Sequence, residues 1–145
     1  MRITRRVDHP ATTTTVHELM SKSIVSGDPR QSLVEAAAQM RAHRISALAV
    51  LNEEAIVGII TERDFLRAIA EGRDPAATHI SEYMTHSPRT IEDAELVAKA
   101  AEIMVKHRVR HLPVTNNGRL IGFLSARDLL ALNPWPLNLP IGESW

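Results

Sequence analysis

The stretch Gly58-Ile59-Ile60-Thr61-Glu62-Arg63-Asp64 recurs 64 residues later as Gly122-Phe123-Leu124-Ser125-Ala126-Arg127-Asp128. Around it, residues 17–68 align with residues 81–132 without a gap, and 15 of the 52 aligned positions are identical. Two copies with so long a period are too few for a solenoid. Each copy is instead the size of a half-domain, and two such halves bury their apolar faces against each other with approximate two-fold symmetry. We therefore expect a matched pair of clefts at the seam, where small molecules bind readily.

The composition limits the classes of function. The chain has 145 residues, enough for one compact unit, and its 17 basic and 17 acidic residues give a formal net charge of +0. This balance gives no global attraction to nucleic acid or to an acidic membrane, and an aromatic content of 3% leaves no base-stacking surface. No apolar run is long enough for a membrane span or a secretory signal. The absence of cysteine excludes disulfides and thiolate metal sites, so we expect a cytoplasmic protein.

The hydrophobic pattern predicts the same first elements in both copies. A short helix leads into an extended segment, and an amphipathic helix follows that ends near a His-Arg pair. The short helices are expected at 16–20 and 80–84, the extended segments at 23–26 and 87–90, and the His-Arg pairs are 43–44 and 107–108. Ser32 and Glu35 form a capping-box pattern in copy one, and Asp93 or a neighbour is expected to cap the helix in copy two.

The second part of each copy predicts a hairpin and a closing helix. The expected strands are 46–51 with 56–60 and 110–115 with 119–124, and the expected closing helices are 62–71 and 126–132. Asn117-Gly118 is a strong tight-turn signal, and Asn52-Glu53-Glu54 is a weaker one. Gly72, and Asn133 followed by Pro134, suit helix C-termini. The order is β-α-β-β-α twice, which predicts a mixed α/β (α+β) fold of two repeats with pseudo-two-fold symmetry.

The chain divides by this reading into five segments. They are an N-terminal extension at 1–11, a first repeat at 12–71, a linker at 72–79, a second repeat at 80–132 and a tail at 133–145. The short polar linker holds the halves closely together, and the tail carries Trp135 and Trp145, which either contact a partner or pack back on the module.

The repeated stretch carries the chemistry, and it has two interpretations. A glycine permits close approach to the backbone, a hydroxyl at a helix start suits a phosphate, and a carboxylate three residues later can accept from ribose hydroxyls. The same hydroxyl and carboxylate form an ordinary helix cap worth about 1 kcal/mol. The glycine three positions before the hydroxyl, and the recurrence of the whole pattern in both copies, favour a nucleotide-binding role.

On these motifs the chain resembles a tandem pair of CBS domains (cystathionine-β-synthase-type regulatory domains, together a Bateman module). The family pattern Gly-apolar-x-Thr/Ser-x-x-Asp/Asn closes both halves. The segment Arg110-His111-Leu112-Pro113-Val114 resembles the family strand that ends in Leu-Pro-Val, whereas copy one has Ala47-Leu48-Ala49-Val50 without the proline. The resemblance covers about residues 12–132.

The resemblance implies adenosine-containing ligands (AMP, ADP, ATP, S-adenosylmethionine, NAD or NADH) in the clefts between the halves. Carried over to this chain, Asp64 and Asp128 hold ribose hydroxyls, and Thr61 and Ser125 face phosphate. The segments Ser23-Ile24-Val25 and Ser87-Pro88-Arg89 line the adenine. The remaining implied ligand-binding residues are Arg63, Arg110, His111 and Arg127.

The two implied clefts differ in charge. Arg110 occupies a position where related proteins place a phosphate-contacting residue, and its counterpart in copy one is Ser46. Because a polyphosphate needs cationic partners, the cleft that Arg110 reaches is expected to be the stronger one for charged ligands. Arg89 opposite Val25 predicts that one adenine pocket is more polar.

We therefore expect a non-enzymatic regulatory module that pairs as a homodimer and signals by conformational change to a separate effector protein. We expect no catalytic residues, no metal site and no obligatory cofactor; an adenine nucleotide is the regulatory ligand. Two alternatives stay open. One is a structural or interaction scaffold whose Thr/Ser and Asp residues only cap helices, and the other is a nucleotide hydrolase, for which no nucleophile or acid–base pair is visible.

Overall fold

The structure is a computed structural model, and it describes residues 10–132. The first part comprises a 3₁₀ turn η1 (Pro10–Thr12), α1 (Val16–Leu19), β1 (Ser26–Gly27), α2 (Leu33–His43), β2 (Ala47–Asn52), β3 (Ala55–Thr61) and α3 (Glu62–Ala70). The second comprises a 3₁₀ turn η2 (Ile80–Glu82), β4 (Thr85–His86), β5 (Ile91–Glu92), α4 (Val97–His107), β6 (His111–Asn116), β7 (Arg119–Ser125) and α5 (Ala126–Leu130). Most of the expected N-terminal extension and the whole tail, with Asn133, Pro134, Trp135 and Trp145, lie outside the described residues.

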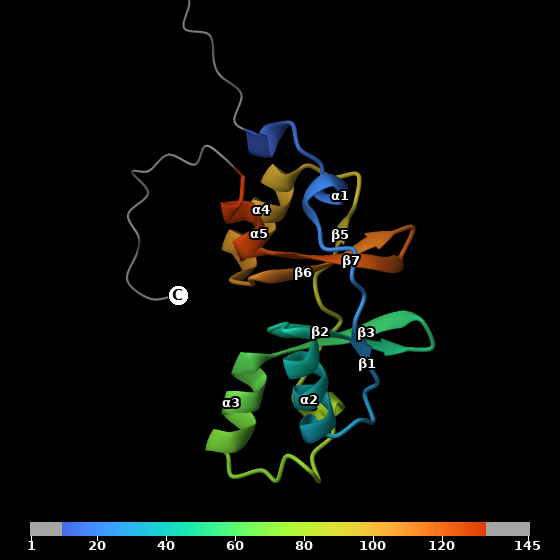
Figure 1. Cartoon of the computed structure of the whole chain (residues 1–145), viewed down its shortest axis with the longest axis vertical. Helices are drawn as coiled ribbons and strands as arrows, with labels where there is room; N and C mark the ends of the chain where they lie inside the picture. The colour runs from blue at the N-terminus through green and yellow to red at the C-terminus, as the bar shows by residue number, and fades with distance from the viewer. Residues whose placement is uncertain (1–9, 133–145) are drawn as a thin grey trace, which may run out of the picture.

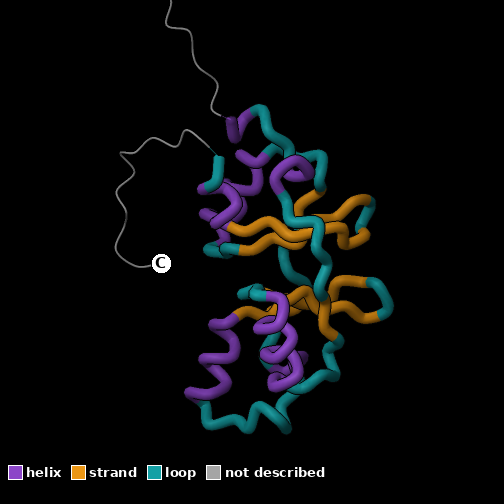
Figure 2. The backbone as a smooth tube through the Cα atoms, viewed as in Figure 1, coloured by secondary structure: helices purple, strands orange, loops and turns teal. Residues whose placement is uncertain are grey.

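Two small mixed sheets lie across the middle of the molecule, and the helices cover their outer faces (Figures 1 and 2). The strand orders are β1-β2-β3-β4 and β5-β6-β7. In each sheet the first strand pairs parallel with the second, which pairs antiparallel with the third. The expected β-α-β-β-α order and the mixed fold class are confirmed.

The amphipathic helices begin in different ways in the two copies. Ser32 and Glu35 form the expected capping box of α2: the Glu35 carboxylate accepts from the Ser32 N–H at 3.0 Å, and the Ser32 hydroxyl accepts from the Glu35 N–H at 3.1 Å. The expectation that Asp93 caps α4 is wrong, because the N-cap is Leu96. The Val97 N–H donates instead to the carbonyl of Thr14 at 2.9 Å. A backbone carbonyl of the segment before α1 thus accepts from the first residue of α4, where no side chain caps the helix.

The hairpins form as the turn signals predict, and the strand ends agree to within one residue. Both central residues of each turn have positive φ: 50° and 75° at Glu53 and Glu54, and 50° and 79° at Asn117 and Gly118. Two positive φ values in a two-residue connection match the right-handed twist of the flanking strands. Gly72, with φ of 72°, ends α3 as expected.

Two expectations for the entry segments are corrected. The segment expected to be a helix at 80–84 is a 3₁₀ turn followed by β4, whose residues Thr85 and His86 pair with β3. Extended segments were expected at 23–26 and 87–90, but the strands lie later in the chain: β1 begins at Ser26 and β5 at Ile91. Ser87 adopts a left-handed backbone with φ of 47°, which interrupts an extended path there.

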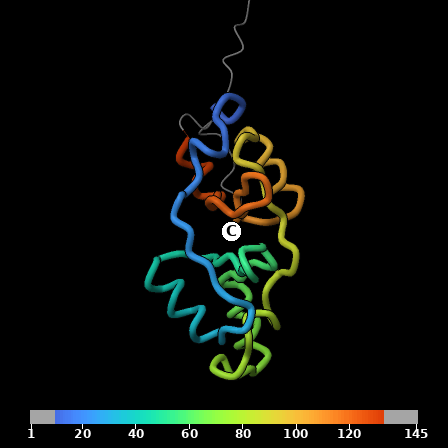
Figure 3. The backbone as a smooth tube through the Cα atoms, turned by 90° about the vertical axis from the view of Figure 1, so that its right-hand side faces the viewer, coloured from blue at the N-terminus to red at the C-terminus, as the bar shows by residue number. Residues whose placement is uncertain are grey.

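The two halves exchange their entry segments. Val16 and Met20, from the first copy, pack in a core with α4, β6 and β7 of the second. In return Ile80 and Met84, from the second copy, pack in a core with α2, β2 and β3 of the first. Figure 3 shows the two crossing segments running on opposite sides of the molecule. Each hydrophobic core therefore needs residues from both sequence repeats.

The inner faces of the sheets form the seam between the halves. Leu48 and Val50 of β2 pack against the helices, so Ala49 between them points to the opposite face, where it is fully buried. Residues of β3 and β7 contact each other across this seam. Within residues 10–132, no helix is both long and apolar enough to cross a membrane.

Candidate functional site

The first repeated motif ends β3 and starts α3. The Thr61 N–H donates to Oδ2 of Asp64 at 2.9 Å, and the Thr61 hydroxyl donates to the same oxygen at 3.3 Å. The other carboxylate oxygen, Oδ1, lies 3.7 Å from the Arg67 guanidinium. Side-chain exposure of Asp64 is 16%, so this carboxylate is largely shielded from solvent.

The second repeated motif ends β7 and starts α5 with a full capping box. The Ser125 N–H donates to Oδ2 of Asp128 at 2.8 Å, and the Ser125 hydroxyl accepts from the Asp128 N–H at 3.2 Å. The Ser125 hydroxyl thus acts as an acceptor for a helix N–H, whereas the Thr61 hydroxyl donates to a carboxylate. The helix caps that the sequence allowed are therefore present, and each uses one of the two carboxylate oxygens.

A hydrogen bond joins the two halves between these motifs. The Ser46 hydroxyl lies 2.9 Å from Nε2 of His111, so the residue before β2 contacts the first residue of β6. Burial lowers the pKa of His111, and the nearby Arg110 charge lowers it further, while Glu62 and Asp128 oppose these effects. His111 therefore stays neutral at a pH where an exposed histidine is partly charged. The sequence indicates Ser46 only as the counterpart of Arg110 and does not predict its contact with His111.

Strand register brings the entry segments to the same end of the sheets as the motifs. In copy two Ile91 pairs with Val114 in parallel, so the residues just before Ile91 run toward the start of β6, where Arg110 and His111 lie, whereas the Ser87 N–H donates to the Val57 carbonyl of β3 at 3.2 Å. His111 in turn pairs with Ser125 across the antiparallel ladder. Copy one repeats the arrangement, because Ser26 pairs with Ala49 and Ala47 pairs with Thr61. Each sheet end thus collects an entry segment, a strand start and a capped carboxylate.

The arginines of the expected site lie in different surroundings. Arg110 is exposed directly before β6, and its carbonyl accepts from the Ala126 N–H at 2.8 Å. Arg89 lies near His107, whose pKa is lowered mainly by partial burial and then by the Arg89 charge. Arg63 and Arg127 are exposed one position before the aspartates. Because successive helical residues point about 100° apart, these two guanidiniums leave their helices in other directions than the carboxylates.

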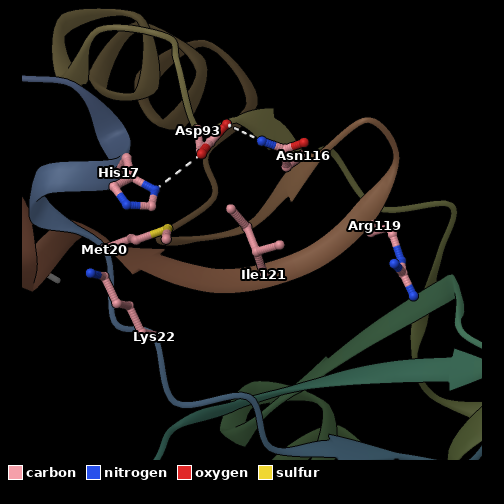
Figure 4. A pocket seen from close by; sticks show the side chains of 7 residues that line it. All are labelled: His17, Met20, Lys22, Asp93, Asn116, Arg119 and Ile121. Atoms are coloured by element: carbon pink, nitrogen blue, oxygen red, sulfur yellow. Dashed lines mark hydrogen bonds and ion pairs between the residues drawn. The ribbon is translucent and has the colours of Figure 1, made fainter.

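A separate pocket of about 440 Å³ lies on the hairpin side of the second half (Figure 4). It is lined by His17, Met20, Lys22, Asp93, Asn116, Arg119 and Ile121. None of these residues was expected to bind a ligand, since they come from separate sequence segments that only the exchange of entry segments brings together. Among the described residues, no three histidine, aspartate or glutamate side chains are grouped as metal ligands.

Known proteins share this arrangement. The sequence profile of the CBS domain matches residues 16–71 and 80–133. Uncharacterized protein MK0525 of Methanopyrus kandleri is 32% identical over 123 residues, which cover 83% of this chain but only 63% of that protein. The chain therefore spans less than two thirds of that relative's length.

Two similar solved structures contain ligands. The CBS domain protein PAE2072 of Pyrobaculum aerophilum, complexed with AMP, is 33% identical with a TM-score of 0.76, covering 81% of this chain and 92% of that one. The CBS domain pair of protein MJ0100, in complex with 5′-methylthioadenosine and S-adenosyl-L-methionine, is 30% identical with a TM-score of 0.75, covering 80% and 92%.

Proposed function

Because the chain belongs to the CBS-domain family, with two copies of the domain in tandem, we propose that it is a non-enzymatic regulatory module that binds adenosine-containing ligands in the clefts between its halves. AMP, ADP, ATP, S-adenosylmethionine and NAD(H) are the candidate ligands. AMP in one similar structure and S-adenosyl-L-methionine in another support this class of ligand.

The observation that carries the proposal is the carboxylate of each cap, of which only one oxygen, Oδ2, is bonded to the capping residue. Oδ2 of Asp128 accepts the Ser125 N–H, which fixes the side chain and leaves Oδ1 to accept from a ribose hydroxyl. A carboxylate held in place by a backbone donor costs little side-chain entropy when a ligand binds. The hydrogen bond that caps the helix through Oδ2 thus also orients Oδ1 as an acceptor for a ribose hydroxyl. Helix capping and ligand binding by the motif are therefore compatible.

We assign the stronger phosphate site to the second copy. Arg110 adds a cation beside its cap, and a guanidinium pairs with phosphate through parallel charge-assisted hydrogen bonds. At the corresponding position of the first copy, Ser46 is neutral and already bonded to His111. In addition, Oδ1 of Asp64 has Arg67 nearby, whereas Oδ1 of Asp128 is left for the ligand. The first cleft therefore suits a less charged adenosyl ligand.

Signalling would follow from the position of the clefts across the seam. A ligand that contacts both halves favours the arrangement of halves to which it binds more tightly, and it shifts the population by that difference in affinity. The Ser46–His111 hydrogen bond is the cross-seam contact that such a shift would stretch or shorten. A separate effector protein would then recognise one arrangement.

Pairing of two copies is part of this proposal. Leu66 and Ile69 of α3 are 68% and 64% exposed, and Leu130 of α5 is 61% exposed. These apolar side chains lie on the closing helices of the two halves, and burying them against a second copy would remove apolar area from water. We expect light scattering to give a dimer mass, and Leu66→Glu with Leu130→Glu to give a monomer.

Thermal unfolding of the nucleotide-stripped protein with each candidate ligand tests the binding proposal. A ligand at about 100 times its dissociation constant stabilises the folded state by roughly 2.7 kcal/mol. We expect a clear shift with at least one adenosyl ligand, and loss of that shift in Asp64→Ala or Asp128→Ala. Removing either aspartate also removes a cap, worth about 1 kcal/mol, which by itself lowers the melting temperature.

Glu35→Ala is the matched control, because it removes the capping box of α2 away from the sheet ends. It should lower stability by a similar amount while leaving the ligand shift intact. A flat response to every ligand would favour the scaffold alternative. Steady release of phosphate from ATP that stops in Asp64→Ala or Asp128→Ala would favour the hydrolase alternative.

A further inference from the structure

The pocket on the hairpin side of the second half is lined by cationic side chains at its ends and apolar side chains between them. Figure 4 shows Lys22 and Arg119 at opposite ends, with Met20 and Ile121 between them as an apolar floor. His17 and Asp93 form the remaining wall together with Asn116. A volume of about 440 Å³ accommodates a small organic molecule.

Only the second half has this combination of residues. By the internal alignment, Lys22, Asp93 and Arg119 correspond to His86, Pro29 and Ala55 of the first half. The backbone differs as well: β4 pairs with β3 over two residues in the first half, whereas the equivalent contact in the second is a single bridge between Ser21 and Phe123. His86 also turns back to the Ser81 carbonyl at 3.1 Å. In the first half the entry segment pairs with β3 as strand β4. In the second half the entry segment contacts β7 through one bridge, and a charged pocket lies beside it.

The charges in the pocket favour an anion. Both carboxylate oxygens of Asp93 are engaged, one by Nδ1 of His17 at 3.0 Å and the other by the Asn116 amide at 3.3 Å. Among the described residues, Lys22 forms no ion pair. Within residues 10–132 the one ion pair of Arg119 is with Glu54, at 3.8 Å, and both side chains are more than three-quarters exposed, so this pair is weak. Two cations are thus available, and the single carboxylate is already satisfied.

We propose that this pocket is a second binding site, for a small anion that carries an apolar body, such as an aryl phosphate. The apolar body would cover Met20 and Ile121, and the anionic group would pair with Lys22 or Arg119. The site lies outside the proposed adenosyl clefts and shares no residue with them. Because Met20 belongs to the first copy's entry segment and Ile121 to β7 of the second copy, an apolar body that covers both would tie this entry segment to the second half.

Titration of the full chain with phenyl phosphate, followed by amide ¹H–¹⁵N spectra, tests the proposal. We expect saturable shifts at the amides of Lys22, Arg119 and Ile121, and affinity about fivefold higher than for inorganic phosphate or phenol, which each supply half of the recognition. One of the two variants Lys22→Gln and Arg119→Ala, the one that removes the partner of the phosphate, should weaken phenyl phosphate binding about fivefold or more, and an unchanged affinity in both would overturn the proposal. Neither change touches the hydrophobic cores, so both variants should fold.

Lys99→Gln is the control, because it removes a surface lysine of α4 with only a 3.8 Å ion pair to Glu102. It should leave the affinity unchanged. Shifts centred on Ser125 and Asp128 would overturn the proposal by placing the anion in the adenosyl cleft. The absence of saturation up to about 10 mM would also overturn it, since such weak binding is nonspecific. Both results are independent of whether adenosyl ligands bind.

Discussion

The two halves are built from duplicated sequence, and they differ most at their edges. The first half has a four-stranded sheet closed by β4, while the second has a three-stranded sheet; in the part of the chain that the structure describes, its corresponding edge pairs through the single Ser21–Phe123 bridge. Their cleft ends differ too, with neutral Ser46 in the first and cationic Arg110 in the second. The copies share the Asp64 and Asp128 caps and several buried positions such as Leu48 and Leu112, whereas the start of the amphipathic helix and the edge of the sheet differ. The duplication thus preserves one fold in two halves that differ at the edges of their sheets and at the residues before β2 and β6.

The largest expected effect comes from breaking the exchange of entry segments. Ile80→Ala should destabilise the protein by about 2–5 kcal/mol, because Ile80 is fully buried in the core of the first half. Val16→Ala, in the core of the second half, should cost somewhat less because fewer methyl groups are removed. Urea unfolding measures both values.

Amide hydrogen exchange shows which half each change weakens. Val16→Ala should speed exchange in β6 and β7 more than in β2 and β3, although Val16 belongs to the first sequence copy. Ile80→Ala should do the opposite. Faster exchange confined to the mutated residue's own repeat would contradict the exchanged cores. Val105→Ala, at an 81% exposed position, should change stability by less than about 0.5 kcal/mol and serves as the control.

This exchange marks the limit of what the sequence predicts. Hairpins and long helices follow from local signals, such as the Asn117-Gly118 turn and the Ser32–Glu35 capping box, and these were confirmed. Which core receives Val16 or Ile80 depends on contacts between distant segments, and their apolar spacing is the same for either choice. The sequence therefore indicates that Val16 and Ile80 are buried, but it does not indicate in which of the two cores.

The two motif glycines give the next comparison. A Cβ on Gly122 would lie 2.5 Å from the Ser21 carbonyl oxygen, which belongs to the bridge on the edge of β7. A Cβ on Gly58 would overlap only the Met84 side chain, which has rotamers available. Gly122→Ala should therefore cost about 2–3 kcal/mol and Gly58→Ala about 1–2 kcal/mol. Equal losses in urea unfolding would show that Met84 cannot move in its core.

These contacts identify the groups that approach the two motif glycines. From the sequence, each glycine is expected to let another group approach the backbone closely. The structure gives each one a crossing segment or methionine as its neighbour. A motif glycine can thus be required by the fold itself. No pattern in the sequence distinguishes a segment of the same chain from a ligand as the group that approaches.

Exchanging residues between the two clefts tests their difference in charge. Arg110→Ser gives the second copy the residue of the first, and it should weaken ATP binding about tenfold, or 1.4 kcal/mol, because a phosphate loses a charge-assisted partner. Adenosine affinity should change little, since adenosine carries no phosphate. Calorimetric titration of both ligands measures the contrast. An equal loss for both ligands would mean that Arg110 maintains the shape of the cleft rather than contacting phosphate.

The smallest expected effect concerns pH at the seam. Burial and Arg110 hold the folded-state pKa of His111 below its unfolded value, so the unfolded chain takes up the proton first as pH falls. The contribution to stability is complete above the ordinary histidine pKa and is lost as pH falls from there through the folded-state pKa. His111→Gln keeps a polar group near Ser46 but does not titrate. As pH is lowered from 7.5 to 5, its free energy of unfolding in urea should therefore fall less than that of the wild type, and the points are best spaced around the ordinary histidine pKa of about 6.5.

Ser46→Ala separates the hydrogen bond from the titration. It should lower stability by about 1 kcal/mol at every pH, because it leaves Nε2 of His111 without its 2.9 Å partner while the imidazole stays buried. The pH dependence should remain, since burial and the Arg110 charge are the main causes of the shifted pKa and both persist. If Ser46→Ala abolished the pH dependence, the cross-seam hydrogen bond itself would control the protonation of His111. The two halves would then be coupled through the state of one imidazole, and acidification would loosen the seam directly.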